Sequence, residues 1–268
     1  MQENSALGRA LAVVRELRAR CPWDRSQTRE TLRPYLVEEV LELDQALAEG
    51  DPRVIRAELS DLLLHLAFQV VLAEERKEFD AADLADDLEA KMRRRHPHLF
   101  ELGQPEPWER IKRRERRGST LSGVLPTLPP LLKALRLQER AASVGFDWPN
   151  LEGPLAKIGE ELDEVRRELP LGSGDAEQAV ESGDPNEPGS PPTDKLIDEI
   201  GDLLFAIVNL ARKVGVQPSI ALDRSNRKFV SRFEALERLC LQRGIDLEGA
   251  GLKTLDRLWD EVKEQSQG

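Results

Sequence analysis

The feature that most constrains the fold is a helical spacing of apolar residues in two neighbouring segments. Within residues 35–47 and 54–72, apolar side chains recur every three and four residues, which is the pattern of a helix that buries one face. Between the two segments, Glu49-Gly-Asp-Pro52 is a stop-and-turn signal. Two helices joined by so short a loop pack as an antiparallel hairpin. The sequence therefore predicts a helical hairpin here.

The second half of the chain repeats this organisation. Residues 155–169 and 196–214 have the same helical spacing, and no run of alternating strand-type sequence occurs. We therefore expect an all-α fold of two related helical-bundle domains, each built on an antiparallel helix hairpin. The expected domains are 1–117 and 131–268, with a proline-containing linker at 118–130.

The segment that separates the two helices of the second hairpin has a different composition. Residues 172–194 contain four glycines, four prolines and six acidic residues, and no basic residue. Such a segment buries too little apolar surface to offset the entropy of ordering it. We predict a flexible acidic insert within the second domain, and the alternative is a binding tail for a basic partner.

Overall charge and composition exclude several classes of protein. The 268 residues include 50 acidic and 39 basic side chains, a net charge of −11, which makes nucleic acid an unlikely main partner. The longest apolar stretch, 62–73, is interrupted and far shorter than the ~20 residues of a membrane span. Two cysteines and no signal peptide predict a reducing cytoplasm.

One local segment differs in charge from the acidic chain as a whole. Arg110 to Arg117 is strongly basic. We interpret it as a solvated helix end that leads into the linker, while a polyanion-binding patch or interaction module is the alternative.

Paired carboxylates carry the strongest chemical signal. Each predicted helix holds two acids three residues apart, and such residues share one helix face with Cβ atoms ~5–6 Å apart. The pairs are Glu39 and Glu42 with Glu58 and Asp61 in the first half, and Glu161 and Glu164 with Glu199 and Asp202 in the second. Acids that face one another beside an apolar stripe repel and require a cation. Oxygen ligands alone favour Mg²⁺, or Mn²⁺.

The two sets of acids are arranged alike. Glu161 follows Glu39 by 122 residues, whereas Glu199 follows Glu58 by 141. The difference of 19 is accounted for by the acidic insert. The pattern indicates an internal duplication with one expanded loop.

The histidines bear on one alternative function, that of a ferritin-like oxidase. Di-iron bundles use Glu-x-x-His pairs, and the sequence contains none. His65 follows Asp61 by one turn. We expect it to be a hydrogen-bonded packing residue rather than a ligand.

Cationic and aromatic residues follow the same duplication. Lys91 and Arg95 come after the first hairpin, and Lys228 and Arg232 after the second. Two cationic heads on one helix face suit phosphate oxygens, although surface pairing with acids is the alternative. Three tryptophans, Trp23, Trp148 and Trp259, are candidates either for stacking on a base or for anchoring the core.

Several motifs together resemble one family, the MazG-type nucleoside triphosphate pyrophosphohydrolases. They cover nearly the whole chain, in order. They are Cys21-Pro-Trp-Asp-Arg-Ser-Gln-Thr28, Glu38-Glu-Val-Leu-Glu42, Glu58-Leu-Ser-Asp-Leu-Leu63, Arg94-Arg-His-Pro-His-Leu-Phe100, Val144-Gly-Phe-Asp-Trp148, Glu160-Glu-Leu-Asp-Glu164 and Asp198-Glu-Ile-Gly-Asp-Leu-Leu-Phe-Ala-Ile-Val-Asn-Leu-Ala-Arg212.

The resemblance implies an all-α homodimer that hydrolyses NTPs and dNTPs to nucleoside monophosphate and pyrophosphate with Mg²⁺, in housecleaning or regulation of the nucleotide pool. It implies that Glu161, Glu164, Glu199 and Asp202 hold the metal, and that Lys157, Lys228, Arg232 and Trp259 meet the nucleotide. From the residue types, we expect Glu160 or Glu161 to take a proton from the attacking water. The acids of the first half are intact and predict a second metal site. A nucleotide- or metal-binding regulatory protein without turnover is the alternative.

Overall fold

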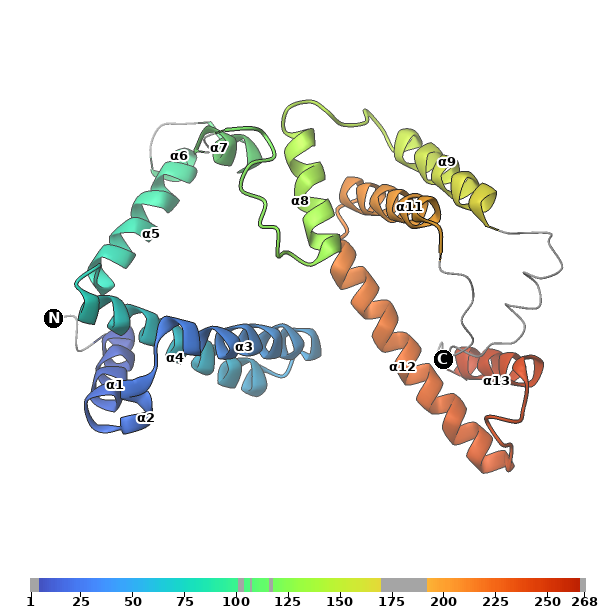
Figure 1. The fold of residues 1–268 in the computed structure, drawn as a ribbon, viewed down its shortest axis with the longest axis horizontal. Helices are drawn as coiled ribbons and strands as arrows, with labels where there is room; N and C mark the ends of the chain where they lie inside the picture. The colour runs from blue at the N-terminus through green and yellow to red at the C-terminus, as the bar shows by residue number, and fades with distance from the viewer. Residues whose placement is uncertain (1–4, 101–103, 107, 116–117, 170–191, 266–268) are drawn as a thin grey trace. The chain divides into compact units, whose positions relative to one another are not determined.

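The computed structural model describes residues 5–100, 104–106, 108–115, 118–169 and 192–265. Within these ranges the chain forms helices joined by turns and loops, with no strand (Figure 1). The predicted all-α fold is confirmed. The chain divides into two compact units, Met1–Pro105 and Glu106–Gly268.

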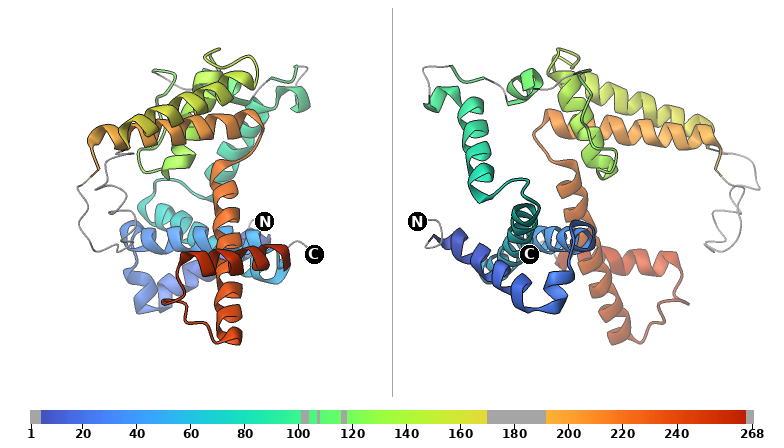
Figure 2. Two further views of the ribbon diagram at one scale, coloured as in Figure 1. Left: turned by 90° about the vertical axis from the view of Figure 1, so that its right-hand side faces the viewer. Right: turned by 60° about the vertical axis from the view of Figure 1, so that its left-hand side comes forward.

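The first unit is built around the predicted hairpin. Helix α3 packs along α4, and α1 packs on α4 from another side (Figure 2). The helices of this unit are α1 (Ala6–Arg20), α2 (Pro22–Ser26), α3 (Arg29–Glu49), α4 (Pro52–Arg76), α5 (Ala81–Arg95) and α6 (Pro97–Phe100). Both hairpin helices therefore extend the segments that periodicity predicted.

The turn of this hairpin has the expected local chemistry. Gly50 ends α3 in the left-handed region with φ of 83°, a conformation that glycine adopts without a steric penalty. Asp51 then caps α4 by accepting a hydrogen bond from the Arg53 amide, and Pro52 occupies the first helical position, where its missing amide costs nothing. These residues reverse the chain within two positions.

The core of the first unit lies where three helices meet. Leu11 and Val14 of α1 and Leu32 of α3 contact a buried run of α4 that includes Phe68 and Val71. Because α4 contributes most of this run, it is the central helix of the unit, and burial of these side chains drives its packing.

The second unit contains a second packed helix pair, α9 with α11. Helix α8 packs on α11 and on α12, and α13 packs on α12. Figure 1 shows α9 and α11 side by side, with α12 leading away from the end of α11. The helices are α7 (Trp108–Glu115), α8 (Pro130–Ala142), α9 (Glu152–Glu168), α11 (Asp194–Lys213), α12 (Pro218–Arg243) and α13 (Leu252–Gln265).

The acidic insert predicted at 172–194 lies mostly outside the described residues. Its last two residues start α11 instead: Thr193 caps the helix by accepting a hydrogen bond from the Leu196 amide at 3.1 Å, and Asp194 is the first helical residue. A threonine cap followed by an acid is a strong helix start.

The boundary between the units falls earlier than the linker expected at 118–130. Residues 118–130 and α7 belong to the second unit. The Arg140 guanidinium of α8 donates to the carbonyls of Leu121, Ser122 and Gly123, and Arg113 donates to the carbonyl of Ser143 at 2.9 Å. These charge-assisted bonds attach the segment to α8, so it is not a free linker. Part of the basic segment is thereby engaged within the unit.

None of the described helices combines the length and the apolarity that crossing a bilayer requires.

A matched pair of leucines on α13 tests the packing of the second unit. Leu258 is fully buried among Leu236, Cys240 and Val262, whereas Leu252 is 83% exposed. We expect Leu258→Ala to lower the free energy of unfolding by about 2–5 kcal/mol. Leu252→Ala should change it by less than about 0.5 kcal/mol. Denaturant unfolding monitored by circular dichroism measures both, and equal effects would contradict this core.

Candidate functional site

Three acids of the second unit converge between its paired helices. Glu161 of α9 and Glu199 and Asp202 of α11 each offer a carboxylate oxygen, and these three atoms lie within 4.8 Å of one another. Helix α9 also brings Glu160, Glu161 and Glu164 into a second such group. We call these five residues the second acidic group. The convergence on one side of the helix pair is what the three-residue spacing predicts.

Glu161 is the buried member of this group. It is 4% exposed, its Oε1 lies 2.6 Å from Lys157 Nζ, and its Oε2 has no hydrogen-bond partner. Lys157 also reaches Glu160 Oε1 at 2.8 Å. Hydrogen bonds to Glu160 and Glu161 raise the pKa of Lys157. Even with this ammonium in place, one buried carboxylate oxygen remains unsatisfied, which is a costly arrangement unless another cation is bound.

The neighbouring carboxylates also affect the pKa of Glu164. Partial burial raises the pKa of Glu164, and the charges of Glu199 and Glu161 raise it further. Arg167 lies 3.7 Å from its carboxylate but does not cancel these effects. The group therefore resists carrying its full negative charge without a cation.

The first unit holds an equivalent group. Carboxylate oxygens of Glu39 on α3 and of Glu58 and Asp61 on α4 lie within 4.8 Å of one another. Burial raises the pKa of Glu39, and the charges of Asp61 and Glu42 add to the increase. Glu42 itself stands outside the three-residue group.

His65 lies next to this first acidic group. Its Nε2 is 3.8 Å from Glu39 Oε1, and its Nδ1 is buried without a hydrogen-bond partner. The predicted burial of His65 is confirmed, but the predicted hydrogen bonding is not seen. A distance of 3.8 Å is too long for a hydrogen bond.

Of the residues predicted to bind nucleotide in the second unit, only Lys157 pairs with the acids in the described parts of the chain. Lys228 and Arg232 lie on α12 and form no ion pair among the described residues. Arg232 Nε is buried without a partner. Trp259 of α13 packs on Phe229 of α12, with ring centroids 5.4 Å apart.

The corresponding cations of the first unit lie on α5. Lys91 and Arg95 are in the last two turns of this helix, which follows α4 and packs mainly on α6. The structure does not bring them to Glu39, Glu58 and Asp61.

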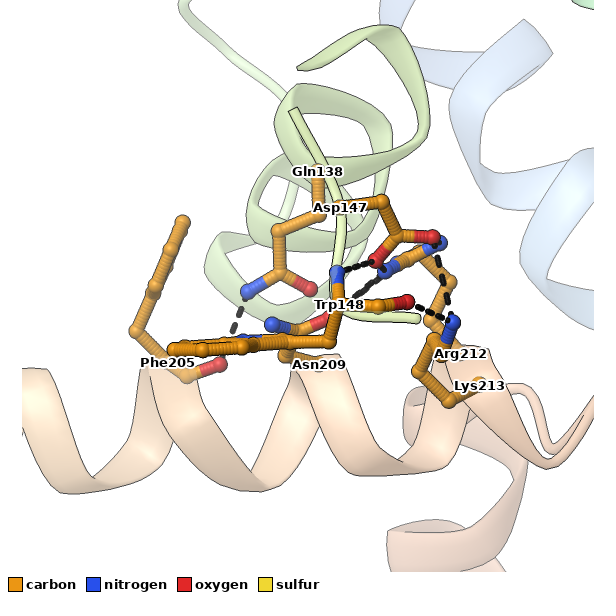
Figure 3. Close-up of polar contacts among 7 residues, drawn as sticks. All are labelled: Gln138, Asp147, Trp148, Phe205, Asn209, Arg212 and Lys213. Carbon is orange, nitrogen blue, oxygen red and sulfur yellow. Dashed lines mark hydrogen bonds and ion pairs between the residues drawn. The ribbon is translucent and has the colours of Figure 1, made fainter. Parts of the chain in front are cut away.

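Sequence reasoning missed a set of contacts around Trp148 (Figure 3). Asp147 pairs with Arg212, and Lys213 Nζ donates to the Trp148 carbonyl at 2.6 Å. Burial tends to raise the pKa of Asp147, but hydrogen bonds and charge from Arg212 and Lys213 hold it below its usual value. These contacts fix the loop before α9 against the end of α11. The sequence did contain a signal for the α11 side of these contacts. Asn209 lies two helical turns after Asp202 and therefore on the same face of the helix.

The donor chemistry of both acidic groups fits a hard divalent cation. Every ligand in them is a carboxylate oxygen contributed by two packed helices, and such sets bind Mg²⁺, Mn²⁺ or Ca²⁺. The unpartnered Glu161 oxygen and the raised pKa values of Glu164 and Glu39 are the physical signs of an uncompensated site. The fold and site together define an all-helical protein in which two helix pairs each carry a group of converging carboxylates.

Comparison with known proteins agrees with this class. The sequence profile of the MazG nucleotide pyrophosphohydrolase domain matches residues 27–100. The chain is 38% identical to the nucleoside triphosphate pyrophosphohydrolase of Escherichia coli, over 97% of each protein. It is also 38% identical to the nucleoside triphosphate pyrophosphohydrolase/pyrophosphatase MazG of Thermotoga maritima, over 94% of each. A Mycobacterium tuberculosis nucleoside triphosphate pyrophosphohydrolase is 34% identical over 54% of this chain and 47% of its own length. The chain belongs to the MazG family.

The raised pKa of Glu164 generates a prediction about stability. A carboxyl whose pKa is raised in the folded state opposes folding once it ionises, so the penalty is present at neutral pH and disappears below about pH 4. We therefore expect Glu164→Gln to raise the melting temperature of metal-free protein at neutral pH, and to reduce the further increase that Mg²⁺ produces.

Asp163→Asn is the matched control. Asp163 is a neighbour on α9 that pairs with Arg166 on the surface, so both melting temperatures should stay unchanged. A metal-free melting temperature that falls in Glu164→Gln would contradict the repulsion in this group.

Proposed function

We propose that this chain hydrolyses nucleoside triphosphates, including deoxynucleotides, to nucleoside monophosphate and pyrophosphate at the second acidic group, with Mg²⁺ as the ion. The observation that carries the proposal is the convergence of Glu161, Glu199 and Asp202 within 4.8 Å, in a chain 38% identical to full-length pyrophosphohydrolases. The two cysteines, Cys21 and Cys240, are unpaired, which supports a cytoplasmic location.

The position of each residue in the second acidic group indicates its role in the proposed reaction. Glu161, Glu164, Glu199 and Asp202 hold the ion, which when bound neutralises phosphate charge and lowers the pKa of a water molecule. Glu160 is exposed beside these ligands, so it would serve as the base that takes a proton from the attacking water, with Glu161 as the other candidate base. Lys157 pairs with both carboxylates. With an ion bound to the acids, Lys157 would be free to turn toward the substrate phosphates.

Lys228, Arg232 and Trp259 reach the site from a second copy of the chain. Helix α12 leaves α11 without packing along α9, and it exposes apolar side chains that a single chain does not cover. The exposed apolar residues on α11 and α12 include Ile197, Leu204, Ile207, Ile220, Phe229 and Val230. Apolar side chains exposed on two successive helices are typical of a subunit interface. We therefore propose a homodimer in which α12 of one copy supplies cations to the acids of the other.

The first acidic group, Glu39, Glu58 and Asp61, is proposed as a second cation site, with Glu42 beside it. Lys91 and Arg95 would meet phosphate there only if α5 also packs against another copy. The ligand geometry of the first acidic group matches that of the second group. Any difference in activity between the two halves must therefore come from other residues.

Single substitutions in the two groups separate their contributions. We expect Asp202→Asn to reduce release of pyrophosphate and nucleoside monophosphate by at least about a hundredfold, because a ligand for the phosphate-binding ion is lost. Chromatography of the products from a panel of NTPs and dNTPs with Mg²⁺ measures this. Asp61→Asn is the matched change in the first half.

Unchanged turnover in both single variants and in the double variant would contradict the proposed site. Nucleotide binding without any product in the wild-type protein would instead indicate a regulatory binding protein.

The proposed dimer predicts a mass of twice 30.2 kDa in solution. Val230→Glu places a charge on the apolar face of α12, so we expect it to shift the protein toward the monomer and to lower activity, since burial of an unpaired charge is unfavourable. Gln242→Glu, further along the same helix, is the control. Sedimentation velocity gives both masses, and a wild-type monomer that is fully active would contradict the shared site.

A further inference from the structure

One buried histidine of the first unit has no role in the proposed function. His65 lies on α4 with its side chain only 10% exposed, and its Nε2 faces Glu39 Oε1 of α3 at 3.8 Å. Its Nδ1 is buried without a partner, and none of the described residues forms a hydrogen bond with either ring nitrogen. A buried imidazole normally donates from one nitrogen and accepts at the other, so this arrangement is unfavourable unless something binds there.

The distance between His65 and Glu39 suits two ligands of one ion. At 3.8 Å, Nε2 and Oε1 are too far apart for a hydrogen bond. Zn²⁺ binds imidazole nitrogen and carboxylate oxygen at ~2.0–2.2 Å, so two atoms bound to the same ion lie at most about 4.3 Å apart. The separation of Nε2 and Oε1 falls within that limit. One ion can therefore bind both atoms.

Helix α4 places His65 on the face that carries the acids. Glu58, Asp61 and His65 follow one another at intervals of three and four residues, a spacing that aligns side chains along one helix face. Oxygens of Glu39, Glu58 and Asp61 lie within 4.8 Å of one another, whereas the imidazole is not that close to all three. It approaches them at Glu39, through Nε2. An ion held by the acids would gain His65 as a further ligand from that side.

The second unit has no imidazole at the equivalent position. Asp202 follows Asp61 by 141 residues. The same spacing places Ala206 at the position of His65, and Ala206 is buried. A methyl group cannot bind an ion, so oxygen ligands alone are available in the second acidic group.

The positive charge beside the acids also differs between the units. Lys157 lies 2.6 Å from Glu161 in the second unit. Glu161 follows Glu39 by 122 residues, and the same spacing places Tyr35 at the position of Lys157. An ammonium group thus accompanies the acids of the second unit, and an imidazole accompanies those of the first. The two groups differ in ligand chemistry although their carboxylates are alike.

We propose that His65 is a metal ligand and that the first acidic group binds a transition-metal ion of the Zn²⁺ and Co²⁺ class through Glu39, Glu58, Asp61 and His65 Nε2. The inference rests on the proposed second cation site and assigns the class of ion that it takes. Imidazole nitrogen suits Zn²⁺ and Co²⁺, whereas Mg²⁺ prefers oxygen ligands. The two halves of the chain would therefore hold different ions.

Calorimetry with Zn²⁺ and with Mg²⁺ on the full-length chain tests the proposal without turnover. The parent protein is Glu199→Gln/Asp202→Asn, in which the second acidic group has lost two ligands. We expect His65→Gln in this parent to weaken Zn²⁺ binding by about tenfold or more, because a nitrogen ligand is lost. Mg²⁺ affinity should change by less than about twofold, because magnesium depends on the carboxylates. Unchanged Mg²⁺ binding also shows that the variant has folded.

His98→Gln in the same parent is the matched control. His98 is an exposed histidine of the first unit, on α6, which packs on α5. Its replacement should leave both affinities unchanged. X-ray absorption at the zinc edge gives a second measurement that does not depend on affinity. We expect imidazole scattering in the parent with one equivalent of Zn²⁺ and in His98→Gln, and its loss in His65→Gln.

A parent spectrum with oxygen ligands alone would overturn the proposal, even if His65→Gln fails to fold. Unchanged Zn²⁺ affinity in His65→Gln would overturn it too, as would tighter binding of both ions, which is expected if His65 is only a cation paired with Glu39. If the parent still binds an ion, the first group remains a cation site and the role of His65 alone is wrong. If the parent binds neither ion, the proposed second cation site is wrong as well. Hydrolysis at the second group is tested separately by Asp202→Asn.

Discussion

Repulsion between carboxylates that two packed helices force together is the interaction on which the rest of the structure depends. Glu161 is buried with one oxygen unsatisfied, and its neighbours across the helix pair are Glu199 and Asp202. Such an arrangement destabilises the folded protein unless a cation balances the negative charge. Apolar packing along α9 and α11 supplies the stability that holds these acids in place. In the proposed function, a bound cation would reverse the local charge so that an acidic protein can accept a polyphosphate.

The same scaffold occurs twice, yet the two halves differ in what surrounds the acids. In the first unit, Phe68 and Val71 close the core, and His65 lies against Glu39. By the 141-residue spacing that relates Asp61 to Asp202, Asn209 and Arg212 of the second unit stand at the positions of Phe68 and Val71. Arg212 then holds Asp147, which positions Trp148 over an open cavity. The two halves thus differ at two positions of one helix face. Apolar side chains fill the core of the first half there, whereas polar side chains line a cavity of about 450 Å³ in the second.

Much of this architecture is predictable from sequence because it depends on local spacing. The helices, the turn at Gly50-Asp51-Pro52 and the convergence of the acids all follow from intervals of three and four residues within or between adjacent helices. The positions of Lys228 and Arg232 could not be predicted, because they depend on the direction in which α12 leaves α11. The unit boundary depends on the contacts of Arg140 with three distant carbonyls. The cavity at Trp148 likewise arises from three segments far apart in the chain.

Crystals grown with Mn²⁺ in place of Mg²⁺ test the central claim most directly, because anomalous scattering locates the ion independently of any assay. The account predicts a strong anomalous peak bound by Glu161, Glu199 and Asp202, and loss of this peak in crystals of the Asp202→Asn variant. An anomalous map with no peak between α9 and α11 at saturating Mn²⁺, while those three carboxylates remain together, would contradict it.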